Sequence, residues 1–121
     1  MAKFEIERGA DENMNNDFPL FRYADVLLMK AETEIRLGRS GDNFINQIRS
    51  RAGVTPFSGA TLDDVLAERG REMFCEGHRR QDLIRFGEFT KSWWEKDASD
   101  DDRKLFPIPQ WAIDANPNLG G

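Results

Sequence analysis

The stretch RYADVLLMKAETEIRLGRSGDNFINQIRSRAG, residues 22–53, decides the fold. Its apolar residues recur at three- and four-residue steps, which predicts a helix from about residue 21 to 37. The positions expected to be buried in that helix are Ala24, Leu27, Leu28, Ala31 and Ile35. A second helix is expected over residues 42–51, with Asp42 as its N-cap. Because only residues 38–41 join the two helices, they must lie antiparallel as a hairpin.

The sequence after residue 53 predicts a second helix pair. Thr61 opens a helix expected to run to about Glu76, which buries Leu62, Val65, Leu66, Met73 and Phe74. Gly77 interrupts it, and the next helix is expected over residues 79–87. The sequence leaves open whether residues 88–96 form a further short helix. The tail, residues 105–118, contains three prolines and should be extended, with at most one helical turn at residues 110–115.

Length and composition limit the classes of protein that the chain can represent. A chain of 121 residues fits one domain. We expect residues 1–17 to be a poorly ordered N-terminal segment and residues 18–121 to form a helical domain. No apolar run approaches the length of a membrane span, and no signal peptide is seen, so an exported parent would need a signal and anchor that this chain lacks. The net charge of −5 argues against nucleic acid as a partner.

Four stretches, taken in order, resemble the C-terminal region of the SusD/RagB family. They are RYADVLLMKAE (residues 22–32), INQIRSRAG (45–53), ERGREMFCEGHRRQDLIRFG (68–87), and PIPQ followed by IDANPNL (107–119). One such stretch would be a weak match, but four in register over nearly the whole chain are a specific signal.

This resemblance implies a fold and a function. The fold would be all-α, with tetratricopeptide-like helix pairs and an extended Pro-rich C-terminal tail. The parent would be a nutrient-binding lipoprotein on the outer membrane, at the cell surface, that takes part in polysaccharide utilization. It would bind oligosaccharide and work with a TonB-dependent transporter in uptake, without cleaving the glycan. The alternative is a stand-alone helical-repeat module that binds a protein or peptide partner.

Trp93 and Trp94 are the candidate ligand-binding residues. Sugar rings present apolar C–H faces, and tryptophan offers the largest flat surface for stacking together with an N–H donor. The alternative is that both tryptophans cover the helical core, and the sequence leaves that choice open.

The charged residues between positions 68 and 85 are interpreted as a structural ion-pair cluster. Their spacing places Glu76 three residues before Arg79 and Asp82 three before Arg85, which suits pairing within a helix or across a helix junction. The cluster is expected to comprise Glu72, Glu76, Arg79, Asp82 and Arg85. Gly70, in the middle of the third helix, is expected to mark a close helix contact.

Catalysis and metal binding have little support in the sequence. Cys75 and His78 are three residues apart, and such a pair can form a nucleophile, but Gly77 interrupts the helix between them. A zinc site needs about four ligands, and the chain has one cysteine and one histidine. We therefore expect no enzyme activity, no cofactor and no metal.

A second apolar face is expected on the first helix, formed by Phe21, Tyr23 and Leu28. In a longer parent it would dock the rest of the protein. An exposed apolar face on an isolated domain favours association with a second copy, so self-association of this chain is predicted.

Overall fold

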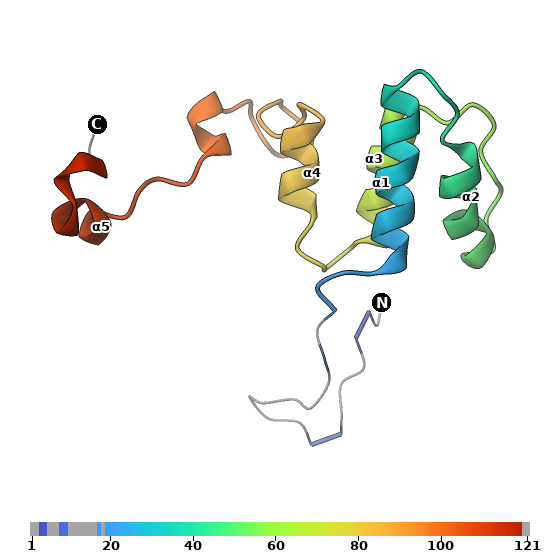
Figure 1. The fold of residues 1–121 in the computed structure, drawn as a ribbon, viewed down its shortest axis with the longest axis horizontal. Helices are drawn as coiled ribbons and strands as arrows, with labels where there is room; N and C mark the ends of the chain where they lie inside the picture. The colour runs from blue at the N-terminus through green and yellow to red at the C-terminus, as the bar shows by residue number, and fades with distance from the viewer. Residues whose placement is uncertain (1–2, 5–7, 10–16, 18, 120–121) are drawn as a thin grey trace. The chain divides into compact units, whose positions relative to one another are not determined.

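The computed structural model describes residues 3–4, 8–9, 17 and 19–119. These residues form helices and turns, with no strand beyond an isolated bridge between Trp93 and Lys96. The α-helices are α1 (Tyr23–Arg36), α2 (Asp42–Arg51), α3 (Leu62–Glu72), α4 (Arg79–Arg85) and α5 (Gln110–Ala115) (Figure 1). Two 3-10 turns follow α4 and α5, η1 (Asp101–Lys104) and η2 (Pro117–Leu119). The predicted all-α class is confirmed.

The chain divides into two compact units, Met1–Asp82 and Leu83–Gly121. Most of the segment 1–17, predicted to be poorly ordered, lies outside the described residues. The assignment of residues 18–121 to one domain stays a prediction.

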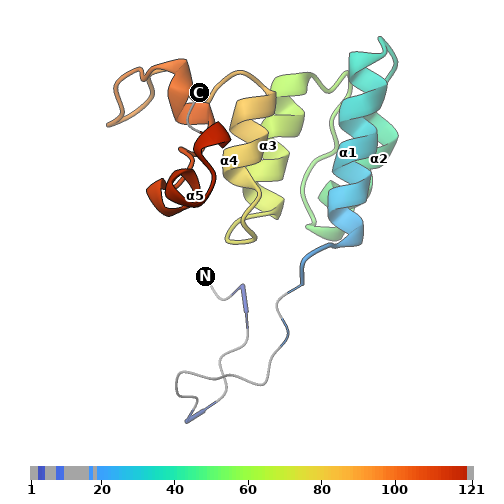
Figure 2. The same cartoon turned by 60° about the vertical axis from the view of Figure 1, so that its left-hand side comes forward.

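The first unit is built around α1, which packs against both α2 and α3 (Figures 1 and 2). The buried apolar side chains come from the faces that the periodicity predicted, and they are Ala24, Leu27, Leu28, Ala31, Ile45, Ile48, Val65, Leu66 and Met73. Leu28 has no exposed surface, so its assignment to a second apolar face of α1 was wrong. It lies on the same side of the helix as Leu27 and Ala31, which are also buried. Phe21 and Tyr23 are exposed, as that prediction required.

Gly41 allows α1 and α2 to approach each other closely. A Cβ atom at this position would lie 2.7 Å from the backbone oxygen of Ala31 and 2.9 Å from the Ile35 side chain. Gly41 is also the N-cap of α2, so the prediction that Asp42 is the N-cap was wrong. The Asp42 carboxylate instead accepts hydrogen bonds from the backbone N–H groups of Gly59 and Ala60, both at 2.8 Å. Those two bonds lower the pKa of Asp42.

The N-terminus of α3 has the predicted cap. The Thr61 hydroxyl accepts from the Asp64 backbone N–H, and the Asp64 carboxylate accepts from the Thr61 backbone N–H, which forms a capping box. The helix ends at Glu72, four residues before the predicted end. Residues 73–77 form a turn, with Cys75 in the left-handed region at a φ of 61°. As a result Phe74 is 51% exposed, and its predicted burial was wrong.

The second unit contains short helices joined by turns. The short helix considered for residues 88–96 does not form, and these residues adopt turns that include the Trp93–Lys96 bridge. The expected helical turn at residues 110–115 is present as α5. Leu105 and Pro109 have extended backbone angles, whereas Pro117–Leu119 form η2, so an extended tail over residues 105–118 stays a prediction.

Candidate functional site

The two candidate tryptophans lie on a loop in the second unit that is closed at its base. The backbone N–H of Ser99 donates to the carbonyl oxygen of Thr90 at 2.9 Å. The Thr90 hydroxyl also lies 3.3 Å from a carboxylate oxygen of Asp101, in the η1 turn that follows. These bonds tie both ends of residues 90–99 together, so the loop between them is restrained.

Within this loop, residues 93–96 form a tight turn, which we call the tryptophan turn. Trp93 and Lys96 exchange backbone hydrogen bonds of 3.0 and 2.9 Å, and Glu95 between them takes a left-handed φ of 57°. Trp94 lies at the tip and is 89% exposed, the largest fraction among the large apolar side chains described, whereas Trp93 is 45% exposed. The alternative that both tryptophans cover the core does not describe Trp94.

Lys96 supports the turn from one side. Its ammonium group donates to the carbonyl oxygens of Lys91 and Asp97 at 2.9 and 3.0 Å. It also lies 5.5 Å from the centroid of the Trp93 ring, within the range of a cation–π interaction. One ring is therefore engaged by the loop, while the Trp94 ring remains available for stacking.

The predicted ion-pair residues mostly contact partners on other elements. Arg22, just before α1, donates from Nε to Glu76 at 2.7 Å and from Nη1 to Glu72 at 2.8 Å. Its Nη2 also donates to the backbone oxygen of Glu72 at 2.8 Å. Lys3 lies 2.5 Å from Glu76, and Arg51 of α2 lies 2.6 Å from Glu72. Glu76 thus pairs with Arg22 and Lys3 and not with Arg79, the partner that sequence spacing suggested.

This arrangement places positive charge at the C-terminal end of α3. Arg22 and Lys3 both donate to the Glu72 carbonyl, one of the oxygens that has no partner within the helix. Burial acts to raise the pKa of Glu76, but the hydrogen bonds from Arg22 and Lys3 outweigh it and lower the pKa below its ordinary value. The hydrogen bond to Glu76, together with that to Glu72, raises the pKa of Arg22 against the opposing effect of burial.

A second charged group is buried inside the first unit. Arg69 of α3 lies 2.8 Å from Asp25 of α1 through Nη1 and 2.8 Å from Asp82 of α4 through Nε. All three side chains are at least 93% buried, and the contacts are close ion pairs without well-aligned hydrogen-bond angles. We call these three residues the buried triad. Burial makes this group costly to disrupt.

The residues that sequence reasoning missed are Arg22, Asp25 and Arg69. A signal was present, since Arg69 follows Leu66 by three residues and precedes Met73 by four, and so lies on the buried face of α3. Asp25 likewise precedes Leu28 by three residues on α1. A charged residue on an apolar helical face needs a partner of opposite charge.

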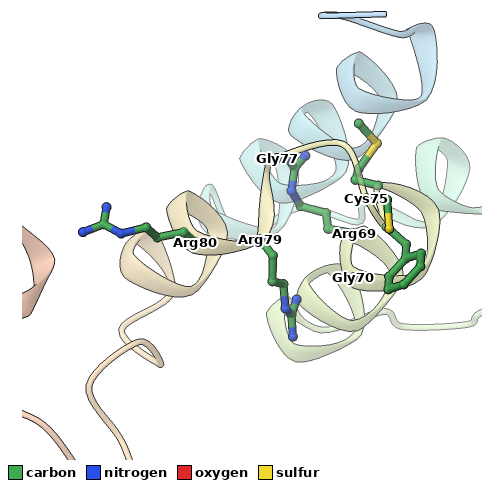
Figure 3. A pocket seen from close by; sticks show the side chains of 8 residues that line it. Arg69, Gly70, Cys75, Gly77, Arg79 and Arg80 are labelled. Carbon is green, nitrogen blue, oxygen red and sulfur yellow. The ribbon is translucent and has the colours of Figure 1, made fainter. Parts of the chain in front are cut away.

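Arg79 and Arg85 have other surroundings. The Arg79 guanidinium donates to the backbone oxygen of Leu66 at 2.9 Å and lies over Gly70, where a Cβ atom would come within 2.9 Å of it (Figure 3). The neighbour at Gly70 is thus the end of a long side chain, and a close contact between helices at this position stays a prediction. The Arg85 guanidinium lies 5.3 Å from the centroid of the Phe86 ring.

A hollow of about 560 Å³ opens at the turn between α3 and α4 (Figure 3). It is lined by Arg69, Gly70, Met73, Phe74, Cys75, Gly77, Arg79 and Arg80. Cys75 is exposed, and no hydrogen bond joins it to His78. Among the described residues no group of three or more histidine, cysteine or acidic side chains could hold a metal ion, and no helix is long and apolar enough to cross a membrane.

The fold defines a class, all-α proteins built from antiparallel helix pairs. The SusD family profile matches residues 3–100, and the chain belongs to that family. It is 36% identical over 115 residues to the starch-binding protein SusD of Bacteroides thetaiotaomicron, an alignment covering 87% of this chain and 21% of that protein.

Two relatives from Formosa agariphila are also similar. The SusD-like protein P38 is 31% identical over 83% of this chain, and the SusD-like protein P25 is 31% identical over 98%. The alignments cover 23% and 27% of those proteins. The chain therefore spans about a fifth to a quarter of the length of the curated relatives that it matches.

Proposed function

We propose that this chain is a non-catalytic part of a glycan-binding protein of the bacterial cell surface. The parent is a lipoprotein at the outer membrane that captures oligosaccharide and works with a TonB-dependent transporter in its uptake. The sugar contact within this segment is the Trp94 ring at the tip of the tryptophan turn. The first unit is a helical scaffold, held by the ion pairs between α1, α2 and α3.

The observation that carries the sugar contact is the exposure of Trp94 on a restrained loop. Trp94 is 89% exposed at the tip of a turn closed by two backbone hydrogen bonds. An apolar ring held open to solvent has no role in the described core, and its flat face suits the C–H face of a sugar. Membership of a family that includes a protein named as starch-binding supports the choice of ligand.

The test is a tryptophan-fluorescence titration of the whole chain with soluble starch, dextran and xylan. Trp94→Ala is expected to lower affinity about ten-fold, which is about 1.4 kcal/mol, and Trp93→Ala to have a smaller effect because its ring is partly covered. Trp111→Ala is the matched control, since Trp111 is 74% exposed but lies outside the tryptophan turn.

A saturable change whose affinity falls about ten-fold in Trp94→Ala and is unchanged in Trp111→Ala would support the sugar contact. Equal titration curves for all the variants would remove Trp94 from the binding site. A flat response to all three polysaccharides would place sugar recognition outside this segment.

The transporter partnership needs a separate experiment. The parent protein, tagged in its native cell envelope, is expected to co-purify with one TonB-dependent transporter in stoichiometric amount. Recovery of the parent alone under mild detergent, with the transporter present in the same membrane, would count against the partnership.

A second candidate is peptide binding by a helical-repeat module, and one hollow favours it. It measures about 430 Å³ and is lined by Arg22, Tyr23, Ala24, Leu27, Gln47, Ile48 and Arg51. Its apolar lining residues suit an apolar side chain of an amphipathic peptide, while Arg22 and Arg51 are paired with Glu72 and Glu76 of this chain. A labelled amphipathic peptide should then show a rise in anisotropy that Tyr23→Ala reduces, and a flat signal up to millimolar protein would exclude this function.

A further inference from the structure

We propose that the tryptophan turn selects uncharged glycans over anionic ones, a selectivity that rests on the proposed sugar contact at Trp94. Stacking on Trp94 is open to any sugar with an apolar face. The charges around the ring then decide which sugars can approach it.

The cations near the turn are engaged within the loop and its flanks. Lys96 donates to two backbone carbonyls and lies near the Trp93 ring. Lys91 pairs with Glu88 at 2.7 Å, and Lys104 pairs with Asp101 at 2.7 Å. Recognition of a sulfate or carboxylate uses Lys or Arg donors directed at the anion. Lys91, Lys96 and Lys104 are directed elsewhere.

The carboxylates nearest to Trp94 in sequence are not held by ion pairs or hydrogen bonds of the kind that hold these lysines. Glu95 directly follows it, and Asp97 comes just after the turn; both are exposed. Among the described residues, no ion pair or side-chain hydrogen bond holds either carboxylate. Residues 88–104 contain six acidic and four basic side chains, so the local charge is negative.

The size of the effect follows from Coulomb's law. In water, at a separation of about 7 Å, repulsion between two unit charges changes an equilibrium constant about three-fold. The ammonium of Lys96 keeps its charge and offsets one of the two carboxylates, so residues 95–97 together predict roughly three-fold weaker binding for a singly charged sugar at low ionic strength. At 1 M salt the Debye length falls to about 3 Å, and most of this difference should disappear.

The first arm of the test measures the charge around Trp94 without any glycan. Fluorescence quenching by caesium and by iodide is recorded for the whole chain and for Trp94→Phe, and the difference gives the Trp94 contribution. After normalisation to free N-acetyltryptophanamide, caesium should quench Trp94 at least about two-fold more than iodide does. The double variant E95Q/D97N should bring the two values together. Equal quenching by both ions in the unmodified chain would overturn the proposal.

The second arm compares soluble starch with carboxymethyl starch, and dextran with dextran sulfate, by affinity electrophoresis at low salt. The neutral polysaccharide of each pair should retard the chain more strongly than the anionic one. The variant E95Q/D97N should reduce this difference in retardation and leave retardation by the neutral polysaccharide undiminished. Equal or stronger retardation by the anionic member, lost in Trp94→Ala, would overturn the selectivity but keep the sugar contact. If none of the four polysaccharides retards the chain while caesium still quenches Trp94 more than iodide does, the sugar contact and the selectivity that rests on it are both refuted.

Discussion

Replacing Arg69 by methionine should destabilise the first unit more than any surface substitution. Methionine keeps much of the length of the side chain but removes the charge that lies 2.8 Å from both Asp25 and Asp82. The carboxylate of Asp25, whose side chain is 7% exposed, is left with too little exposed surface to regain full hydration. Removing one partner from a buried ion pair costs about 3–5 kcal/mol, because the remaining charge is buried without compensation.

This cost is large compared with the stability of a small protein. Domains of this size unfold with about 5–15 kcal/mol, so Arg69→Met is expected to remove a third or more of the total. The assay is urea denaturation at pH 7, followed by far-UV circular dichroism, with the midpoint and slope compared between variants. An unchanged slope with a lower midpoint would identify a change in stability.

Arg71→Met is the matched control on the same helix. The Arg71 side chain is 57% exposed and contacts Glu68 at i,i+3, so its loss should cost under about 1 kcal/mol. The triple variant Asp25→Leu, Arg69→Met, Asp82→Leu tests the physical reason, because removing all three charges together should recover much of the lost stability. If Arg69→Met unfolds within about 1 kcal/mol of Arg71→Met, the argument from uncompensated burial is refuted.

Three further predictions concern other parts of the first unit. The folded-state pKa of Glu76 is lowered below its ordinary value of 4.5, so its stabilising effect is present above that pH and is lost as the pH falls through the lower value. The urea midpoint of Glu76→Gln should therefore be lower than that of the unmodified chain at pH 7 and change less between about pH 5 and pH 3; parallel pH profiles would contradict this. Gly41→Ala should cost about 1–3 kcal/mol, seen in thermal unfolding, because the new Cβ meets the Ala31 backbone oxygen at 2.7 Å. The exposed control Ser50→Ala in α2 should stay within about 0.5 kcal/mol, and equal melting temperatures for the two would exclude a tight helix contact. The isolated chain should self-associate through its exposed apolar residues on and before α1, which include Phe21, Tyr23 and Val26; light scattering should show a larger mass that Val26→Lys reduces, and one monomeric mass at all concentrations would rule this out.

The helices were the most predictable part of the protein. The ranges predicted for α1, α2 and α4 agree with the structure to within two residues at each end, and α3 begins where Thr61 predicted. Each of these signals is local, because apolar periodicity and capping depend on residues within a few positions of one another. The choice of the tryptophans also came from sequence, since it rests on residue type. Their exposure did not, and no local signal predicted the turn that presents Trp94.

The sequence by itself determined the helical class, the α1–α2 helix pair, the family and the participation of Glu72, Glu76 and Asp82 in ion pairs. Only the tertiary structure decided how those charges pair. Glu76 accepts from Arg22, 54 positions away, and Arg69 joins α1 to α4. Spacing along one helix could predict only near neighbours such as Arg79. The physical reason is that an amphipathic pattern specifies which face of a helix is buried. The partner of a buried charge depends instead on which helices pack against that face and on where along the helix axis their charged residues lie.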